Sequence, residues 1–196
     1  MDSGDALALI SSNALTIGMA GLAWHTARQL LQATHVVAAL SFLAVDGSHE
    51  AYAERVHAGR PHFGQVSTAA EMRRLLGAPV RRPARIQDPF GYRCFPQIHG
   101  PAVDATAELG RVLEEHSSFA FQSARQSLGS LTAFRLVLAC ELVAAVRALR
   151  MRDIAPNPDT PLYAAHGLLA SKLNPDVRDR QLSPDVELAA SLLDEL

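Results

Sequence analysis

The sequence has few of the residue types that mark several protein classes. Its 196 residues include two cysteines, Cys94 and Cys140, too few for a disulfide framework or a four-cysteine zinc site. Lysine occurs once, at Lys172, and 18 basic residues against 20 acidic ones give a net charge of −2. This balance excludes the basic surface typical of nucleic-acid-binding domains and the acidic tail of a disordered activator.

Charge is also missing from the N-terminal region. Ala6–Trp24 contains no charged residue over 19 positions, which is the length of a membrane span. Ser11, Asn13 and Thr16 interrupt this stretch, so we expect a buried helix rather than a membrane span. The acidic first residues lack the basic start of a signal peptide, and we therefore expect a cytoplasmic protein.

The hydrophobic residues, 48% of the chain, repeat mainly with helical spacing. Ala14–Val45 is apolar around most of its circumference and ends at Asp46-Gly47, a helix stop. A second long helix is predicted over about 118–150, where apolar residues repeat at spacings of three, four and seven positions. We therefore predict an all-α, long-helix bundle that forms one helical domain over 1–196, with the two long helices packed parallel or antiparallel. Such apolar helices in a short chain also predict an oligomer.

Shorter elements follow from local signals. Five prolines between positions 79 and 101 predict an ordered loop over 77–102, with helix resuming near Val103. Ser67–Leu76 is predicted as a short helix with Ser67 as its cap. A helical hairpin is expected at 160–196. Ser183 is predicted as the N-cap of its last helix, and Pro184 as the first helical residue.

Four stretches of this chain resemble parts of the C-terminal portion of the histidine and phenylalanine ammonia-lyases, and they occur in the same order as in that family. Two are long and specific: one resembles Arg-x-His-x-x-Arg-Pro-His-x-Gly-Gln and the other Gln-Asp-Pro-Tyr-Ser-Leu-Arg-Cys-x-Pro-Gln. The other two resemble Leu-Ala-Leu-Ile-Asn-Gly-Thr and Asp-Arg-x-Leu-x-Pro-Asp. Along this chain the four stretches are residues 6–10, 55–65, 87–97 and 179–185, and the two specific ones are the second and third.

The resemblance implies the helical fold of the aromatic amino acid lyases and an active site assembled from several chains of a tetramer. These enzymes use a methylideneimidazolone electrophile that forms from an Ala-Ser-Gly tripeptide. The resemblance reaches only the part of the family that follows this tripeptide. Asp2-Ser3-Gly4-Asp5 echoes it at the wrong place. We therefore expect that this chain encodes no cofactor, and that a methylideneimidazolone group could come from a partner chain.

Three candidate substrate-binding residues lie in the Gln-Asp-Pro segment. Arg93 matches the family arginine that binds the substrate carboxylate, a task suited to the two parallel hydrogen bonds of a guanidinium. A salt bridge that stabilises the loop is the alternative role. Phe90 stands where the family has an active-site tyrosine, and it lacks the phenol needed for proton transfer. Gln87 could hold the loop in shape.

Further candidates come from other segments. Ser11 aligns with a family asparagine that contacts electrophile and substrate, and Asn13 follows two positions later; helix capping is the alternative for both. Glu114, the catalytic candidate, aligns with the first residue of a Glu-Asp-His-Val-Ser stretch and could be a base or an amine-binding carboxylate. It could equally be an ordinary surface residue, and a rival alignment places 112–113 in the helix just after the Gln-Asp-Pro segment. His57 and His62 lack a third ligand, so we expect no metal site.

Two functions from different classes remain open. The chain could be a subunit of an ammonia-lyase-like or aminomutase-like enzyme for an aromatic or imidazole amino acid, completing a site with a chain that carries the electrophile. Alternatively, it is a repurposed or inactive homologue that binds a small molecule or acts as a scaffolding homo-oligomer. Phe90 and Ser11 favour the second, whereas the well-kept Gln-Asp-Pro segment favours the first. Neither predicts that the chain acts alone as an ammonia-lyase.

Overall fold

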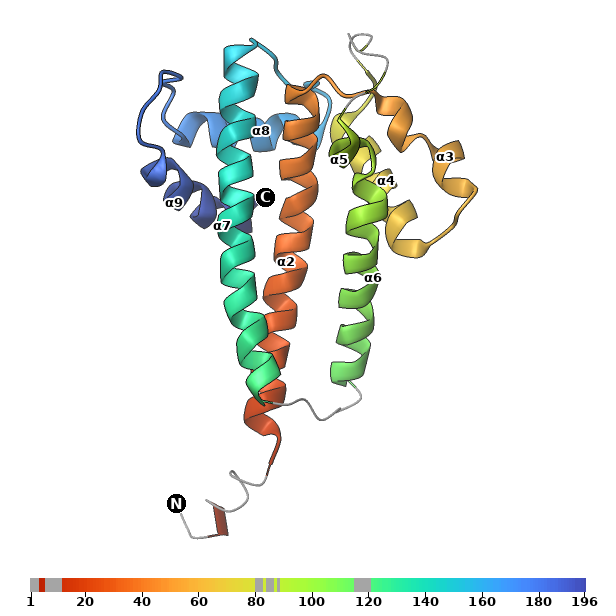
Figure 1. Ribbon diagram of the computed structural model, residues 1–196, viewed down its shortest axis with the longest axis vertical. Helices are drawn as coiled ribbons and strands as arrows, with labels where there is room; N and C mark the ends of the chain where they lie inside the picture. Colours follow the sequence, from red (N-terminus) through yellow and green to blue (C-terminus); the bar gives the residue numbers. More distant parts are fainter. Residues whose placement is uncertain (1–3, 6–11, 80–82, 84–86, 88, 115–120) are drawn as a thin grey trace.

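Three long helices lie side by side and form the body of the protein (Figure 1). The computed structural model describes residues 4–5, 12–79, 83, 87, 89–114 and 121–196, without the side chains of 114, 121 and 122. Helices α2 (Ala14–Ala44) and α7 (Phe121–Met151) run parallel, and α6 (Phe95–Glu114) runs antiparallel to both. No strand occurs in these described ranges, so the predicted all-α bundle is confirmed.

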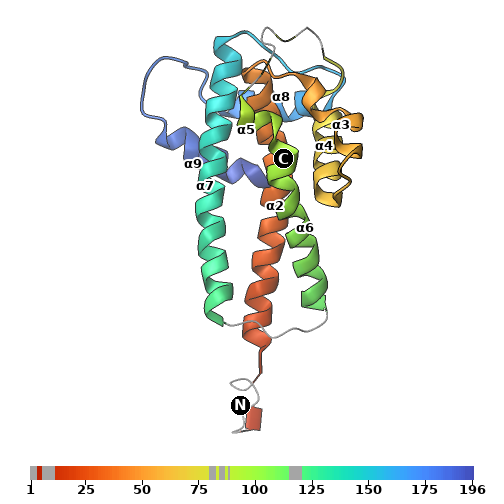
Figure 2. The ribbon, with the colours of Figure 1, turned by 45° about the vertical axis from the view of Figure 1, so that its right-hand side comes forward.

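Shorter helices surround one end of this body (Figure 2). On the side of α6 lie the 3-10 helix η1 (His49–Tyr52) and helices α3 (Glu54–Ala58), α4 (Phe63–Leu76) and α5 (Phe90–Arg93). On the side of α7 lie α8 (Pro161–Lys172), α9 (Ser183–Leu192) and the 3-10 helix η2 (Leu193–Glu195). The two helices α8 and α9 occupy the segment predicted as a hairpin.

The core lies where α2 and α7 pack together. Both helices have 31 residues, and their ends agree closely with the two long helices predicted from the apolar repeat. Their facing side chains are fully buried together with leucines of α8 and α9; the largest include Leu30, Leu40, Phe42, Leu142, Leu149, Leu162, Leu169 and Leu192. Burial of this apolar surface, worth about 25 cal/mol per Å², stabilises the bundle.

The predicted loop over 77–102 is wrong from Phe90 on, because α5 occupies Phe90–Arg93 and α6 begins at Phe95 rather than near Val103. Pro96 falls in the first turn of α6, where the backbone N–H has no helical partner to lose. Pro101 lies inside the helix and removes one hydrogen bond. The packing of α6 against α2 and α4 outweighs that loss, which proline spacing alone did not reveal.

Helix boundaries were predicted with mixed success. The stop after α2 is confirmed: Asp46 has φ 60° and the N–H of Gly47 donates to the carbonyl of Phe42 at 3.0 Å. The start of α4 is wrong, since the helix begins at Phe63 and the Ser67 hydroxyl donates to the carbonyl of Gly64 within it. The last helix includes Ser183 and is preceded by Leu182 at the cap position.

The outward face of α7 is apolar. Gly129, Ala133, Leu136, Cys140 and Ala144 are all exposed along one stripe of this helix. The segment Ser123–Met151 has the length and composition of a membrane-crossing helix, which are also those of core helices in globular proteins. Because no part of the described chain covers this stripe, it is an interface candidate.

Candidate functional site

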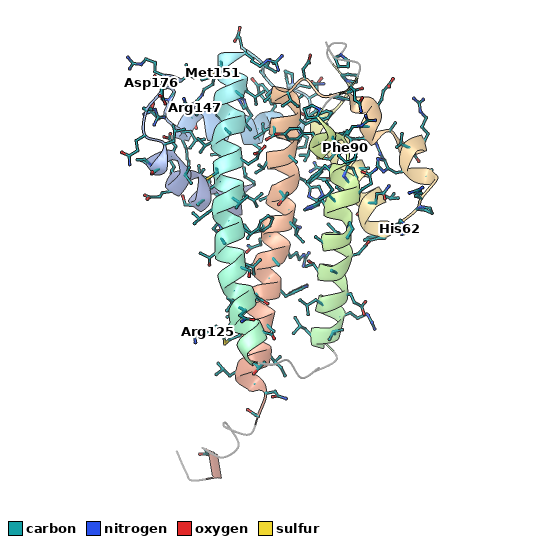
Figure 3. The ribbon with its side chains drawn as sticks, in the orientation of Figure 1. His62, Phe90, Arg125, Arg147, Met151 and Asp176 are labelled. Carbon is teal, nitrogen blue, oxygen red and sulfur yellow. The ribbon has the colours of Figure 1, made fainter. Side chains whose placement is uncertain are left out.

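Helix α5 presents the residues of the Gln-Asp-Pro segment at the upper end of the bundle. Its single turn is closed by the N–H of Arg93, which donates to the carbonyl of Pro89 at 3.3 Å. Arg93 is half-buried, and no hydrogen bond or ion pair engages its guanidinium within the described ranges. The salt-bridge alternative for Arg93 therefore finds no support. Phe90 is 71% exposed (Figure 3), and Gln87 is exposed as well.

A buried polar network fixes this turn from below. The Tyr52 hydroxyl donates to the carbonyl of Tyr92 at 2.6 Å. The Tyr92 hydroxyl donates to Glu141 Oε1 at 3.0 Å, and the Ser41 hydroxyl donates to the same oxygen at 2.5 Å. Burial, followed by the nearby Glu141 charge, raises the pKa of Tyr92. Tyr92 thus points into the bundle and fixes the turn that carries Arg93.

Asn13 lies at the opposite end of the bundle. It precedes α2 and is exposed, and its side chain makes no capping hydrogen bond. Ser11 and the side chain of Glu114 lie outside the described residues. Residues 112–113 belong to α6, the helix that follows α5 directly, as in the rival alignment. The match of Glu114 to the Glu-Asp-His-Val-Ser stretch therefore stays a prediction.

The length of α2 separates the two groups of candidates. Ser41, which is linked through Glu141 to the α5 turn, lies 28 positions after Asn13, or about 40 Å along the helix at 1.5 Å per residue. Five cavities among the described residues are lined by residues other than Arg93, Phe90 and Gln87. One copy of the chain therefore does not gather these residues around one ligand.

The histidine-rich motif at 55–65 has a structural role. His57 is buried, donates through Nε2 to the carbonyl of Ala51 at 3.0 Å, and accepts through Nδ1 from the amide of Gln65 at 3.0 Å. Both ring nitrogens are therefore occupied by protein groups. His62 is exposed (Figure 3), and no group of three or more potential metal ligands occurs among the described residues.

The same motif brings two helices unusually close. A Cβ on Gly64 would lie 2.1 Å from the carbonyl oxygen of Gly100, so α4 and α6 meet at backbone distance. Asp104 of α6 accepts the Gly64 N–H at 2.8 Å and so satisfies a free donor at the start of α4. Sequence reasoning missed this pair because the two glycines are 36 positions apart; the lack of side chains at both positions was the only signal.

The motif at 179–185 also stabilises the fold. Arg180 forms a 2.6 Å ion pair with the buried Asp185, whose pKa is lowered chiefly by the Arg180 hydrogen bond. Arg147 and Arg150 of α7 donate to backbone carbonyls between 170 and 178. These contacts anchor the loop between α8 and α9 (Figure 3), and they include no free group that points to a ligand.

Comparison with known proteins places these features in one family. Residues 1–115 match the family described as aromatic amino acid lyase. The chain is 40% identical over 113 residues to a histidine ammonia-lyase of Treponema denticola, a match that covers 56% of this chain and 22% of that enzyme. A match to histidine ammonia-lyase of Streptococcus sanguinis has 38% identity over 114 residues and covers the same shares. The chain thus spans about a fifth of these relatives.

Solved structures with the same fold cover more of the chain. The phenylalanine aminomutase of Pantoea agglomerans aligns with a TM-score of 0.80 and 14% identity over 90% of this chain and 60% of that one. The histidine ammonia-lyase of Trypanosoma cruzi aligns with a TM-score of 0.72 and 16% identity over 91% and 55%. At these identities the structures establish the fold, and the matched residues 1–115 establish the membership: the chain belongs to the aromatic amino acid lyase family.

Proposed function

We propose that this chain is a subunit of an ammonia-lyase-like or aminomutase-like enzyme that acts on an aromatic or imidazole amino acid. In this proposal, its α5 turn completes an active site on a separate chain that carries the electrophile. The observation behind it is the half-buried Arg93 guanidinium, which has no ion pair among the described residues and follows Tyr92 in the α5 turn, where the Tyr92–Glu141 hydrogen bond lies. A guanidinium fork without a carboxylate partner is suited to a substrate carboxylate.

A site between chains agrees with the separation of the candidates. Asn13 lies about 40 Å along α2 from Ser41, at 1.5 Å per residue, and Ser41 is linked through Glu141 to the α5 turn that carries Arg93. In this proposal Arg93 and Asn13 therefore approach one substrate from different chains. Residues 1–196 contain no Ala-Ser-Gly tripeptide, so in this proposal the other chain supplies the methylideneimidazolone group. When bound in an active site, that group activates the amino acid for loss of ammonia. The role proposed for this chain is to bind and orient the substrate carboxylate.

The apolar stripe of α7 supports an oligomer. Leu136 and Val137 are 49% and 64% exposed, in the middle of a helix face without charged side chains. A homo-oligomer, or a hetero-oligomer with the lyase-type chain, would bury this face. Light scattering should therefore give a mass above the 21.1 kDa of one chain at micromolar concentration. A mass of one chain under these conditions would contradict the proposal.

The activity test compares the pure chain with the complex isolated from its native host. The chain alone should release no urocanate, cinnamate or coumarate from histidine, phenylalanine or tyrosine, because no ordinary side chain replaces the electrophile. The complex should be active, and Arg93→Ala in the complex should lower the rate about 100-fold by misplacing the substrate. Arg125→Ala, an exposed arginine of α7 near its opposite end (Figure 3), is the matched control and should change little.

Two results would contradict this proposal. Activity of the pure chain, together with an intact mass lower by two waters, would show cyclisation at Ser3 and a self-sufficient lyase. A complex that is inactive, or whose activity Arg93→Ala leaves unchanged, would favour the alternative function. That alternative is a repurposed small-molecule-binding or scaffolding homo-oligomer, and it is supported by Phe90, which is exposed and has no group that can transfer a proton.

A further inference from the structure

A second concave site lies between α2 and α6, away from the α5 turn. The two helices enclose a cavity of about 350 Å³ whose walls include Leu31, Val103 and Ala107. This volume is within the range of small-molecule sites, which are mainly apolar with a few polar groups. The lining of the cavity on α2 extends from Trp24 to His35, and the lining includes none of the described residues of the Gln-Asp-Pro segment, Gln87 and Pro89 to Arg93. It is therefore separate from the Arg93 surface.

Trp24 forms a rigid aromatic wall of this cavity. Its indole Nε1–H donates to the carbonyl of Thr106 on α6 at 2.8 Å. The side chain is half-buried, and this hydrogen bond sets the orientation of the ring relative to both helices. A flat apolar group entering the cavity would find the ring already in place, without loss of side-chain entropy on binding.

Arg28 supplies the positive charge at the cavity mouth. Its guanidinium carbon lies 5.7 Å from the centroid of the Trp24 ring, and the side chain is exposed. Two other exposed arginines are paired: Arg74 with Glu71 at 2.6 Å and Arg111 with Glu108 at 2.5 Å. Among the described residues no carboxylate forms an ion pair with Arg28. The guanidinium is therefore available to an anion outside the chain.

His35, at the inner end of the cavity, contributes no charge near neutral pH. Its Nδ1 lies 2.9 Å from the carbonyl of Leu31, and because a carbonyl only accepts, Nδ1 carries the hydrogen. Burial lowers the pKa of His35, with smaller opposing effects from Glu71 on α4. The cavity thus has a neutral apolar interior with one cation at its mouth, a distribution that complements a ring carrying one carboxylate.

We propose that the α2–α6 cavity binds a small aromatic carboxylic acid. The ring lies against Trp24, Leu31 and Val103, and the carboxylate pairs with Arg28. This site goes beyond the function proposed above, because it uses none of the residues of the α5 turn and requires no partner chain.

Trp24 makes the proposal directly measurable. It is the only tryptophan in the chain, so its indole N–H gives one side-chain signal in a proton–nitrogen correlation spectrum. We expect trans-cinnamate to shift this signal saturably, and the uncharged isostere cinnamamide to bind at least tenfold more weakly, since hydrogen bonds to charged groups contribute about 1.5–3 kcal/mol. Arg28→Gln should weaken cinnamate binding by a similar factor.

Two control variants separate this site from other binding. Arg125→Gln removes an exposed arginine that does not line the cavity, and Arg93→Ala removes the carboxylate-binding candidate at the upper end of the bundle. Both should leave the Trp24 response to cinnamate unchanged. The absence of a saturable shift up to the solubility limit would overturn the proposal. So would equal binding of cinnamamide, or unchanged affinity in Arg28→Gln.

Discussion

His99 should make the protein less stable in mild acid. Its side chain is 6% exposed between α2 and α6, stacked on Phe95 with ring centroids 4.8 Å apart and edge-on to His35 at 4.6 Å. The buried Nε2 has no hydrogen-bond partner among the described residues. Burial is the main reason why the pKa of His99 falls to about 4, with a smaller contribution from His35. The folded protein therefore resists protonation of His99.

The magnitude follows from the difference in pKa between the folded and unfolded states. An unfolded histidine has a pKa near 6.5, so between about pH 6.5 and 4 the unfolded chain binds the proton that the folded chain excludes. Unfolding is then favoured as the pH falls. At about 1.4 kcal/mol per pKa unit, His99 alone lowers the free energy of unfolding by about 3 kcal/mol across this window. The pKa of His35 is also lowered by burial, although Glu71 opposes this shift and Arg74 adds slightly to it, so His35 changes stability in the same direction.

The assay is urea unfolding followed by far-UV circular dichroism at pH 7 and pH 4. His99→Phe keeps an aromatic ring beside Phe95 but removes the titrating nitrogen, so it should lose most of this pH dependence. It should also be at least as stable as the wild type at pH 7, because an unsatisfied buried polar atom costs about 1–3 kcal/mol. His25→Gln, at an exposed position of α2, should keep the wild-type dependence. An unchanged slope in His99→Phe would refute the reasoning.

Four further substitutions test the packing and polar contacts. Gly100→Ala should lower the free energy of unfolding by about 2 kcal/mol or more, because its Cβ would lie 2.5 Å from the backbone of α4. Gly129→Ala, whose Cβ would have no neighbour within 4 Å, should raise the free energy of unfolding by about 0.5–1 kcal/mol. Chemical denaturation of both variants measures the difference. Asp185→Asn should lower the free energy of unfolding by about 2 kcal/mol at pH 7 and by little at pH 2. Because the pKa of Asp185 is lowered in the folded protein, its stabilising contribution is present above about pH 3.8 and is lost as the pH falls further. Equal losses at pH 7 and pH 2 would contradict this prediction. Ser41→Ala should lower the melting temperature at pH 7 by removing a hydrogen bond to the Glu141 carboxylate, and an unchanged value would show that the network is dispensable.

Local sequence signals predicted the features that depend on neighbouring residues. The apolar repeats predicted α2 and α7 almost to their ends, because helical periodicity is written within each segment. Asp46-Gly47 predicted the stop after α2 for the same reason. The Gln-Asp-Pro segment predicted the family and identified Arg93 as a carboxylate-binding candidate, since the motif is continuous in the chain.

Tertiary structure decided what depends on distant residues. The Gly64–Gly100 contact allows α4 to cross α6 closely and accompanies a helix through Pro101, where local rules predicted a loop. Tyr92 and Glu141 form a hydrogen bond although they are 49 positions apart in the sequence. No local pattern therefore predicts that this pair fixes the α5 turn. The separation of Arg93 from Asn13 is likewise a property of the folded bundle, because the 31-residue helix α2 holds its two ends apart.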